Sequence, residues 1–201
     1  MNAHSIVAVS CTGRPGNYTS HALAVTVDEL RARGHSVELI DAGELTLAFP
    51  GAPVTDDARR LQATLRTAHG VVLATPEYHG TFSAMTKLII ENLGFPSALA
   101  DKPVALIGVA SGKIGAIKSL EHLKSVLAHI GALVVPGGVS VAGVQAAFDT
   151  ATGACTDANT EAALRSVAKS LLTFMQNYVC PRYILEQQVR ENPGPAAVMP
   201  A

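Results

Sequence analysis

Short, continuous apolar runs alternate along the chain with segments whose apolar residues recur every three or four positions. Residues 6–9, 71–74 and 104–109 form runs without a charged residue. Strands that are buried on both faces have this pattern, so these runs predict central strands of a parallel sheet. Residues 36–40 alternate apolar and polar positions instead, which predicts a strand near the edge. A fifth strand is expected to start at Leu133.

The segments between these runs have the periodicity of helices that bury one face. Leu23, Val27 and Leu30 recur with helical spacing, for example, and Gly34 follows as a stop signal. Thr55 is placed to cap a second helix whose first turn carries two aspartates. The five helices are expected to run from the loop 11–19 to about Arg33, from Thr55 to His69, from Ser83 to Gly94, from Gly115 to Gly131, and from about Asn159 to Tyr178.

Five strands that alternate with five helices predict an α/β fold. Because crossovers between parallel strands are right-handed, the expected architecture is a doubly wound five-stranded parallel sheet with helices on both faces. We expect one domain over residues 1–180, since Pro181 is predicted to end the last helix. Residues 181–201 are then a tail with one or two helical turns around residues 184–189, and we expect this tail to pack on a neighbouring subunit.

Composition excludes several classes of partner and location. The chain of 201 residues has 15 basic and 16 acidic residues, and this balance argues against nucleic acid or an anionic membrane as a partner. The longest apolar stretch, 132–144, is interrupted by proline and glycine and cannot span a bilayer as a helix. The amino terminus has no basic region of the kind that signal peptides have. Three widely spaced cysteines without a C-x-x-C pair predict a reduced, cytoplasmic protein, and the seven histidines show no metal-binding spacing.

The stretch Thr75–Gly80 follows a central strand and interrupts it abruptly. Pro76 cannot donate to a sheet ladder, and it favours extended geometry at the residue before it. Gly80 allows a positive φ. The strand is therefore expected to stop sharply at the carboxyl edge of the sheet, with backbone groups and the ring of Tyr78 facing outward. Such an edge can hold a flat ligand with a polar rim.

Three loops, 11–19, 76–81 and 111–115, leave the carboxyl ends of the three predicted central strands. Ligands of doubly wound sheets bind at this edge, so the loops are expected to form one site. The first loop also precedes a helix, whose free N–H groups and dipole favour an anion such as a phosphate. It supplies the polar side chains Thr12, Arg14, Asn17 and Thr19.

Other phosphate motifs do not match this chain. A dinucleotide fingerprint needs G-x-G-x-x-G, but the first loop has only Gly13 and Gly16. A P-loop fails because Ile114 stands where serine or threonine follows the lysine. Tyrosine phosphatases with a similar sheet place C-x5-R at the end of the first strand, but Asn17 occupies the arginine position here. Cys11 is therefore interpreted as a small residue that fills a strand end.

Two motifs resemble the NADPH-dependent FMN reductase family of flavodoxin-like proteins, and the resemblance extends over about residues 5–178. The stretch T-P-E-Y-H-G-T at 75–81, followed by Lys87, is similar to the family's T-P-E-Y-N-G-S and L-K, with His79 in place of asparagine. The stretch C-T-G-R-P-G-N-Y-T at 11–19 is similar to G-S-x-R-x-x-S-x-N and retains Arg14. The pair Phe82-Ser83 is more similar to the reductase components of two-component flavin monooxygenases.

The resemblance implies FMN as the cofactor and NADPH or NADH as the hydride donor. The acceptor would be a small molecule such as free flavin, a quinone, an azo compound or a metal oxyanion. It also implies a homodimer or homotetramer with flavin sites near the interface. The implied contacts are Thr12, Arg14, Asn17 and Thr19 with the phosphate, Pro76, Glu77, Tyr78, His79 and Gly80 with the ring, and Ser111, Gly112 and Lys113 on the other side.

Some roles stay open at this point. His79 can be a surface residue or a hydrogen-bonding partner of the flavin edge, and Lys113 can be solvated or stabilise the negative charge of reduced flavin. Lys87 and Glu91 are spaced for an ion pair on a helix surface. No general acid or base is nominated, because the cofactor carries the chemistry. The alternatives are a flavodoxin-type electron carrier, which the near-neutral charge argues against, the flavin-supplying reductase component of a two-component monooxygenase, and a flavin-free scaffold or sensor.

Overall fold

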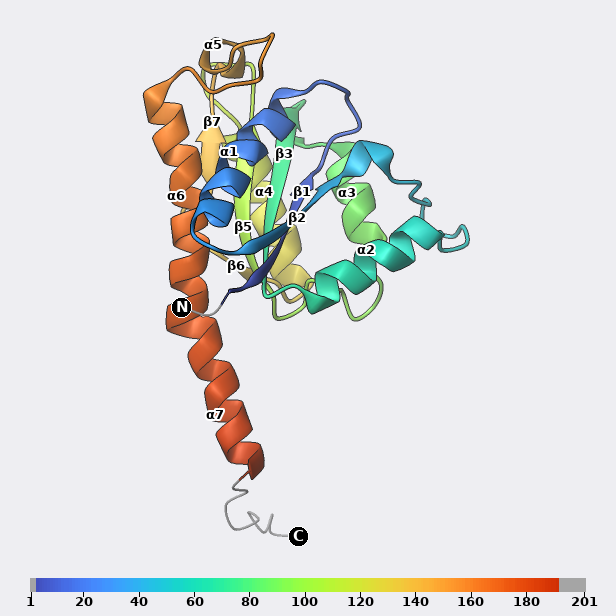
Figure 1. Ribbon diagram of the computed structural model, residues 1–201. Helices are drawn as coiled ribbons and strands as arrows, with labels where there is room; N and C mark the ends of the chain where they lie inside the picture. The colour runs from blue at the N-terminus through green and yellow to red at the C-terminus, as the bar shows by residue number, and fades with distance from the viewer. Residues whose placement is uncertain (1–2, 192–201) are drawn as a thin grey trace.

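A sheet with the strand order β2-β1-β3-β5-β6 forms the centre of the computed structural model, which describes residues 3–191 (Figure 1). This is the flavodoxin-like order 2-1-3-4-5 when the small antiparallel strand β4 is left out. The three continuous apolar runs form the central strands, and the alternating run forms edge strand β2, as predicted. The parallel strands are β1 (Ser5–Ser10), β2 (Ser36–Asp41), β3 (Gly70–Tyr78), β5 (Pro103–Val109), β6 (Leu133–Val134) and β7 (Val139–Val141).

The sheet has seven strands where five were expected. The predicted fifth strand is divided into β6 and β7, which pair with successive parts of β5. Pro136-Gly137-Gly138 lies between them, and a proline without an N–H interrupts a ladder. The remaining strand, β4 (Thr81–Phe82), turns back antiparallel on the end of β3.

Helices cover both faces of the sheet, and each face has its own apolar core (Figure 1). Alternate residues of β1 show the division, because Ile6 and Ala8 belong to one core whereas Val7 and Val9 belong to the other. The first face packs against α1 (Tyr18–Ala32) and α6 (Ala158–Phe174), and the second against α2 (Asp56–Thr67), α3 (Ala84–Glu91) and α4 (Ile117–His129). Short helices η1 (Ala42–Glu44) and α5 (Val144–Ala147) lie in the connections.

Side-chain caps explain where three of these helices begin. Asn17, Thr55 and Ser83 each accept a hydrogen bond from the N–H three residues later, which satisfies one of the free donors at a helix start. Asn17 lies in the first loop that was expected to form the site, and Ser83 lies two residues after the second. The local sequence therefore places the start of α1 and of α3 beside the carboxyl edge of the sheet.

The prediction that Pro181 ends the last helix is wrong. After α6 the chain makes one wide π-helical turn, η2 (Met175–Val179), and continues as α7 (Cys180–Glu191). The Cys180 N–H bonds to the Met175 carbonyl, five residues back. A wide turn of this kind moves the preceding carbonyls away from the proline ring, and Pro181 then occupies the first turn of α7, where its missing N–H is tolerated.

No helix within residues 3–191 combines the length and the apolar character that crossing a membrane would require.

Candidate functional site

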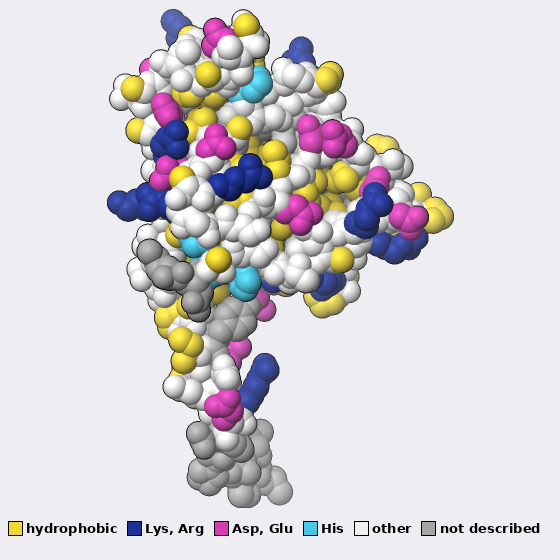
Figure 2. All heavy atoms as spheres, in the orientation of Figure 1, with side chains coloured by type: hydrophobic (Ala, Val, Ile, Leu, Met, Phe, Trp, Pro, Cys, Tyr) yellow, Lys and Arg dark blue, Asp and Glu magenta, His cyan; other side chains and the backbone are white. Residues whose placement is uncertain are grey.

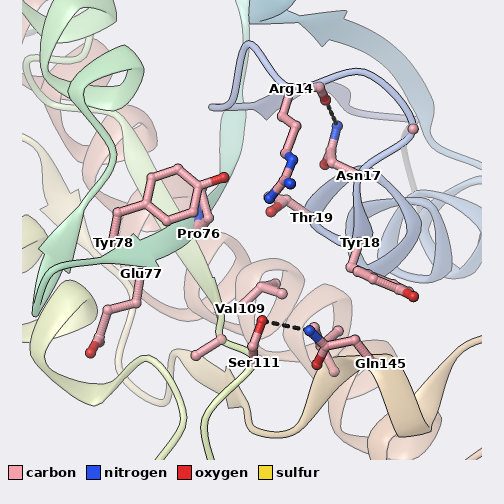
Figure 3. A pocket seen from close by; sticks show the side chains of 13 residues that line it. Arg14, Asn17, Tyr18, Thr19, Pro76, Glu77, Tyr78, Val109, Ser111 and Gln145 are labelled. Carbon is pink, nitrogen blue, oxygen red and sulfur yellow. Dashed lines mark hydrogen bonds between the residues drawn. The ribbon is translucent and has the colours of Figure 1, made fainter.

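A cavity of about 300 Å³ opens at the carboxyl edge of the sheet, and all three predicted loops contribute to it (Figure 3). Its walls also include residues of the short helix α5. Seven of the predicted site residues line it: Arg14, Asn17, Thr19, Pro76, Glu77, Tyr78 and Ser111. The predicted residues Thr12, His79, Gly80, Gly112 and Lys113 do not line it.

Asn17 shapes the first wall. Its Oδ1 accepts a hydrogen bond from the Ser20 N–H at 2.7 Å, and its Nδ2 donates to the Arg14 carbonyl at 2.7 Å. Both ends of the amide are thus used inside the protein. The N–H groups of Tyr18 and Thr19 follow in the first turn of α1, and no acceptor engages them in the part of the chain that the structure describes. The N–H groups of Tyr18 and Thr19 are of the kind that can bind an anion at a helix start, and Asn17 holds the backbone that carries them.

Arg14 supplies the positive charge of this wall. Its guanidinium extends toward Thr19 (Figure 3), and within residues 3–191 it has no hydrogen-bond or ion-pair partner. Thr12 is buried below it, and the Thr12 Oγ1 accepts a hydrogen bond from the Arg14 N–H at 3.2 Å. Thr12 therefore holds the loop in shape, and Arg14 offers a free guanidinium to an anion.

The second wall is the end of β3, which turns back into β4 as a tight hairpin. Tyr78 pairs with Thr81, so the connection consists only of His79 and Gly80. Their φ angles are +52° and +79°, the left-handed pair that a two-residue hairpin of type I′ requires. Gly80 adopts this conformation freely, whereas His79 does so at a cost. His79 lies at the tip of the turn, outside the cavity.

Glu77 connects the second wall with the third. Its carboxylate points away from the cavity (Figure 3), and Oε2 accepts a hydrogen bond from the Ser119 N–H at 3.0 Å. Ser119 is in the first turn of α4, whose own N-cap residue Ala116 provides no side-chain bond. Glu77 therefore caps α4 from a neighbouring strand, and its charge stabilises the positive end of that helix.

Ser111 and Gln145 form the third wall. Gln145 Nε2 donates to Ser111 Oγ at 2.7 Å across the edge of the cavity (Figure 3). Gly112 and Lys113, which follow Ser111, are exposed and do not line the cavity. The sequence reasoning missed Gln145 and also Tyr18. The signal for Gln145 was its position just after a strand that pairs with β5, since the loops that follow neighbouring parallel strands meet at one edge.

Cys11 is the first residue of the first loop, and it is fully buried. Burial raises the pKa of its thiol to about 12, so the group stays protonated at neutral pH. A phosphatase nucleophile must be a thiolate, and the structure therefore supports the interpretation of Cys11 as a packing residue. Lys87 and Glu91 form the expected ion pair on α3.

These features define a flavodoxin-like α/β protein with a cavity between a polar loop and a hairpin at the carboxyl edge of its sheet. The chain belongs to the NADPH-dependent FMN reductase family, whose family model matches residues 4–147. The family predicted from the two motifs is thus confirmed.

Curated relatives and solved structures agree with this assignment. The chain is 29% identical over 126 residues to the NADH:(hydroxy)cinnamate reductase subunit CrdA of Vibrio ruber, covering 61% of this chain and 62% of that protein. It is 37% identical over 86 residues to an NADPH azoreductase of Bacillus sp., and the match covers 43% of this chain and 48% of that protein. In both cases the match spans less than two thirds of the relative. The flavoenzyme NAD(P)H:(acceptor) oxidoreductase FerB of Paracoccus denitrificans shares the fold, with a TM-score of 0.71 and 22% identity. The match covers 88% of this chain and 99% of the FerB chain.

Proposed function

We propose that this protein is an FMN-dependent NAD(P)H oxidoreductase. It would take hydride from NADPH or NADH and pass electrons from FMN to a small-molecule acceptor. The observation that carries this proposal is the cavity. In it, an arginine and helix N–H groups without partners among residues 3–191 lie opposite a hairpin whose sequence resembles the family motif. The family membership supports the same function.

The cavity has the chemical groups that FMN needs. The Arg14 guanidinium, the Thr19 side chain and the N–H groups of Tyr18 and Thr19 suit a phosphate, because charge-assisted bonds and the α1 dipole act together there. Pro76 and Tyr78 provide an apolar and aromatic surface for a flat ring. We propose that Ser111 and Gln145 meet the ring or its chain from the third wall.

When bound, FMN would supply the hydride acceptor atom and the electrons for the second half-reaction. The task of the protein is then to orient the ring and leave one face accessible. Relatives include proteins named azoreductase, 2-hydroxy-1,4-benzoquinone reductase and quinone reductase, and we propose acceptors of these planar, conjugated classes. The three unpaired cysteines are consistent with the reducing cytoplasm that we propose as its location.

Reconstitution tests the proposed function directly. Purified protein mixed with FMN and desalted is expected to retain a flavin absorbance spectrum, and anaerobic NADH or NADPH is expected to bleach it. A quinone or azo dye added afterwards should restore the oxidised spectrum. Failure to bind FMN would refute the proposal. Binding without bleaching would favour an electron carrier, and bleaching that only a partner monooxygenase can reverse would favour a flavin-supplying component.

We also propose that the protein forms a homodimer or homotetramer in which α7 contacts a second copy. The helix projects from the domain as an arm (Figure 1), and hydrophobic side chains follow its described part (Figure 2). Ile184, Leu185 and Val189 are 57%, 61% and 59% exposed. Most helices are stabilised by packing an apolar face, and these three side chains of α7 are left exposed. A neighbouring copy would provide that packing.

Deletion of residues 181–201 is expected to lower the oligomeric state while leaving FMN affinity unchanged, because the arm lies far from the cavity. Sedimentation velocity and an FMN titration measure the two quantities. The single variant Leu185→Glu should act in the same direction, since it places a charge in the exposed apolar face. Gln187→Glu, which adds the same charge at another exposed position, is the control. Loss of FMN binding with an intact oligomer would contradict the proposal.

A further inference from the structure

A group of three buried hydroxyls lies at the base of the hairpin, and the residue of one of them, Thr75, precedes Pro76 of the cavity wall in the sequence. Thr75 lies in β3, two residues before the part of that strand that pairs with β4 in the hairpin. Ser83 follows the hairpin, and Thr86 lies three residues later in the first turn of α3. Their residues are 0%, 3% and 0% exposed. The Oγ1 atoms of Thr75 and Thr86 are 2.8 Å apart, and Thr86 Oγ1 is 2.9 Å from Ser83 Oγ. We call these three residues the hydroxyl unit.

The hydroxyl unit ends on the loop that carries Arg14. Ser83 Oγ donates to the Cys11 carbonyl at 2.6 Å, and this carbonyl can only accept. The Ser83 proton is thereby used, so the Thr86 hydroxyl donates either to Ser83 Oγ at 2.9 Å or to the same Cys11 carbonyl at 3.4 Å. Thr75 then donates to Thr86 at 2.8 Å, which is shorter than its alternative of 3.1 Å to the Pro76 carbonyl. The protons run in one direction, from β3 through α3 to the first loop.

Two backbone donors fix the unit at the base of the hairpin. The Ser83 N–H donates to Thr75 Oγ1 at 3.3 Å, and the Thr86 N–H donates to Ser83 Oγ at 3.1 Å. The residues on either side of the hairpin are thus joined to each other and to Cys11. Buried hydrogen bonds in a network polarise and strengthen one another. Removal of one hydroxyl is therefore expected to weaken the other hydrogen bonds of the hydroxyl unit.

We propose that Thr75, Ser83 and Thr86 act as positioning residues that set the separation between the Arg14 loop and the Pro76–Tyr78 wall. The inference rests on the proposed function, since it treats these walls as the two ends of a flavin site. None of the three hydroxyls lines the cavity, so they act only through the backbone that they hold. A ligand that bridges both walls is sensitive to their spacing, because displacements of about 1 Å can cost on the order of 100-fold in function.

The test uses Thr86→Val, which removes the central hydroxyl and keeps the shape of the side chain. Thr26→Val is the matched control, because Thr26 is also fully buried in a helix and its hydroxyl donates to the Leu164 carbonyl at 2.8 Å, away from the cavity. Both variants are expected to lower the melting temperature of the apo-protein by similar amounts. Only Thr86→Val should weaken FMN binding, by about tenfold or more, and shift the flavin midpoint potential. Thr86→Ser, which restores the hydroxyl, should restore both.

Hydrogen exchange of the apo-protein provides a readout without flavin. Thr86→Val is expected to reduce amide protection in residues 11–19 and 76–82 together, and Thr26→Val in neither. If faster exchange is confined to the start of α3, or if both variants weaken FMN equally, the proposal is wrong. A wild-type protein that binds no FMN would refute the proposed function. Even then, faster exchange of residues 11–19 and 76–82 together in Thr86→Val would support the positioning role. If the two segments did not change together, the positioning role would be refuted as well.

Discussion

Arg14→Ala is expected to weaken FMN binding by roughly 10- to 150-fold, which corresponds to about 1.5–3 kcal/mol for hydrogen bonds to a charged group. The guanidinium has no partner of its own within the described residues, so its removal is expected to lower the affinity for FMN without lowering the stability of the fold. The Arg14 backbone keeps its bonds to Thr12 and Asn17 in the variant. An FMN titration followed by flavin fluorescence measures the change in Kd.

Riboflavin provides the control ligand for this prediction, because it lacks the phosphate. Its affinity should be the same for Arg14→Ala and for the wild type. Arg59→Ala removes an exposed arginine that pairs with Asp56, three residues earlier on α2, and it should change neither affinity. Equal losses of FMN and riboflavin would mean that Arg14 contacts the ring or shapes the loop. An unchanged FMN affinity would place the phosphate elsewhere.

The central sheet could be predicted because burial on both faces has a simple signature. The runs at 6–9, 71–74 and 104–109 are apolar throughout, and they form β1, β3 and β5. Residues 36–40 alternate, and the edge strand β2 leaves Leu39 51% exposed. Such patterns indicate whether a strand is buried on both faces or on one face only.

The end of the last helix could not be predicted from the same signals. Proline normally stops a helix because its ring collides with the carbonyl four residues back. At Pro181 the preceding π turn removes this collision, and a π turn has no strong local signature. The two-residue strands β4 and β6 are also too short for any period to be visible.

At the site, the motifs identified the walls but not the direction of every side chain. Asn17 and Glu77 have polar side chains in cavity-lining positions, yet both are used as helix caps, of α1 and α4 respectively. His79 is at a hairpin tip because the turn needs a positive φ there. These outcomes depend on which backbone donors are left free nearby, and that is decided by three-dimensional packing. Contacts of these residues with flavin stay predictions.

The second large effect is expected at Gly108, where β5 passes under the start of α4. A Cβ atom at this position would lie 2.8 Å from the Ala116 Cβ and 2.9 Å from the Leu120 Cγ. Neither neighbour is the free end of a flexible side chain, so α4 would have to move away from the sheet. Gly108 pairs with Thr75 on one side and Ser140 on the other, which prevents the strand from retreating. Close approach of helix and strand is the reason for glycine here.

Gly108→Val is therefore expected to destabilise the protein by about 1–3 kcal/mol, the usual cost of overpacking, although valine favours a strand by up to about 1 kcal/mol. For a chain of this size the melting temperature should fall by roughly 3–10 °C. FMN binding should weaken as well, because the start of α4 carries the Ser119 N–H that holds Glu77 in the second wall. Thermal unfolding followed by circular dichroism, with and without FMN, measures both effects.

Gly112→Ala is the stability control for this experiment, since a Cβ atom at Gly112 would meet nothing within 4 Å. Its melting temperature should stay within about 1 °C of the wild type. Gly108→Ala, which adds only the Cβ atom, should lie between this control and the valine variant. If Gly108→Val melts like the wild type, then α4 moves away from the sheet without a loss of stability, and the contact with Gly108 does not fix the start of α4. If it melts lower but binds FMN normally, the Glu77–Ser119 connection is dispensable for the site.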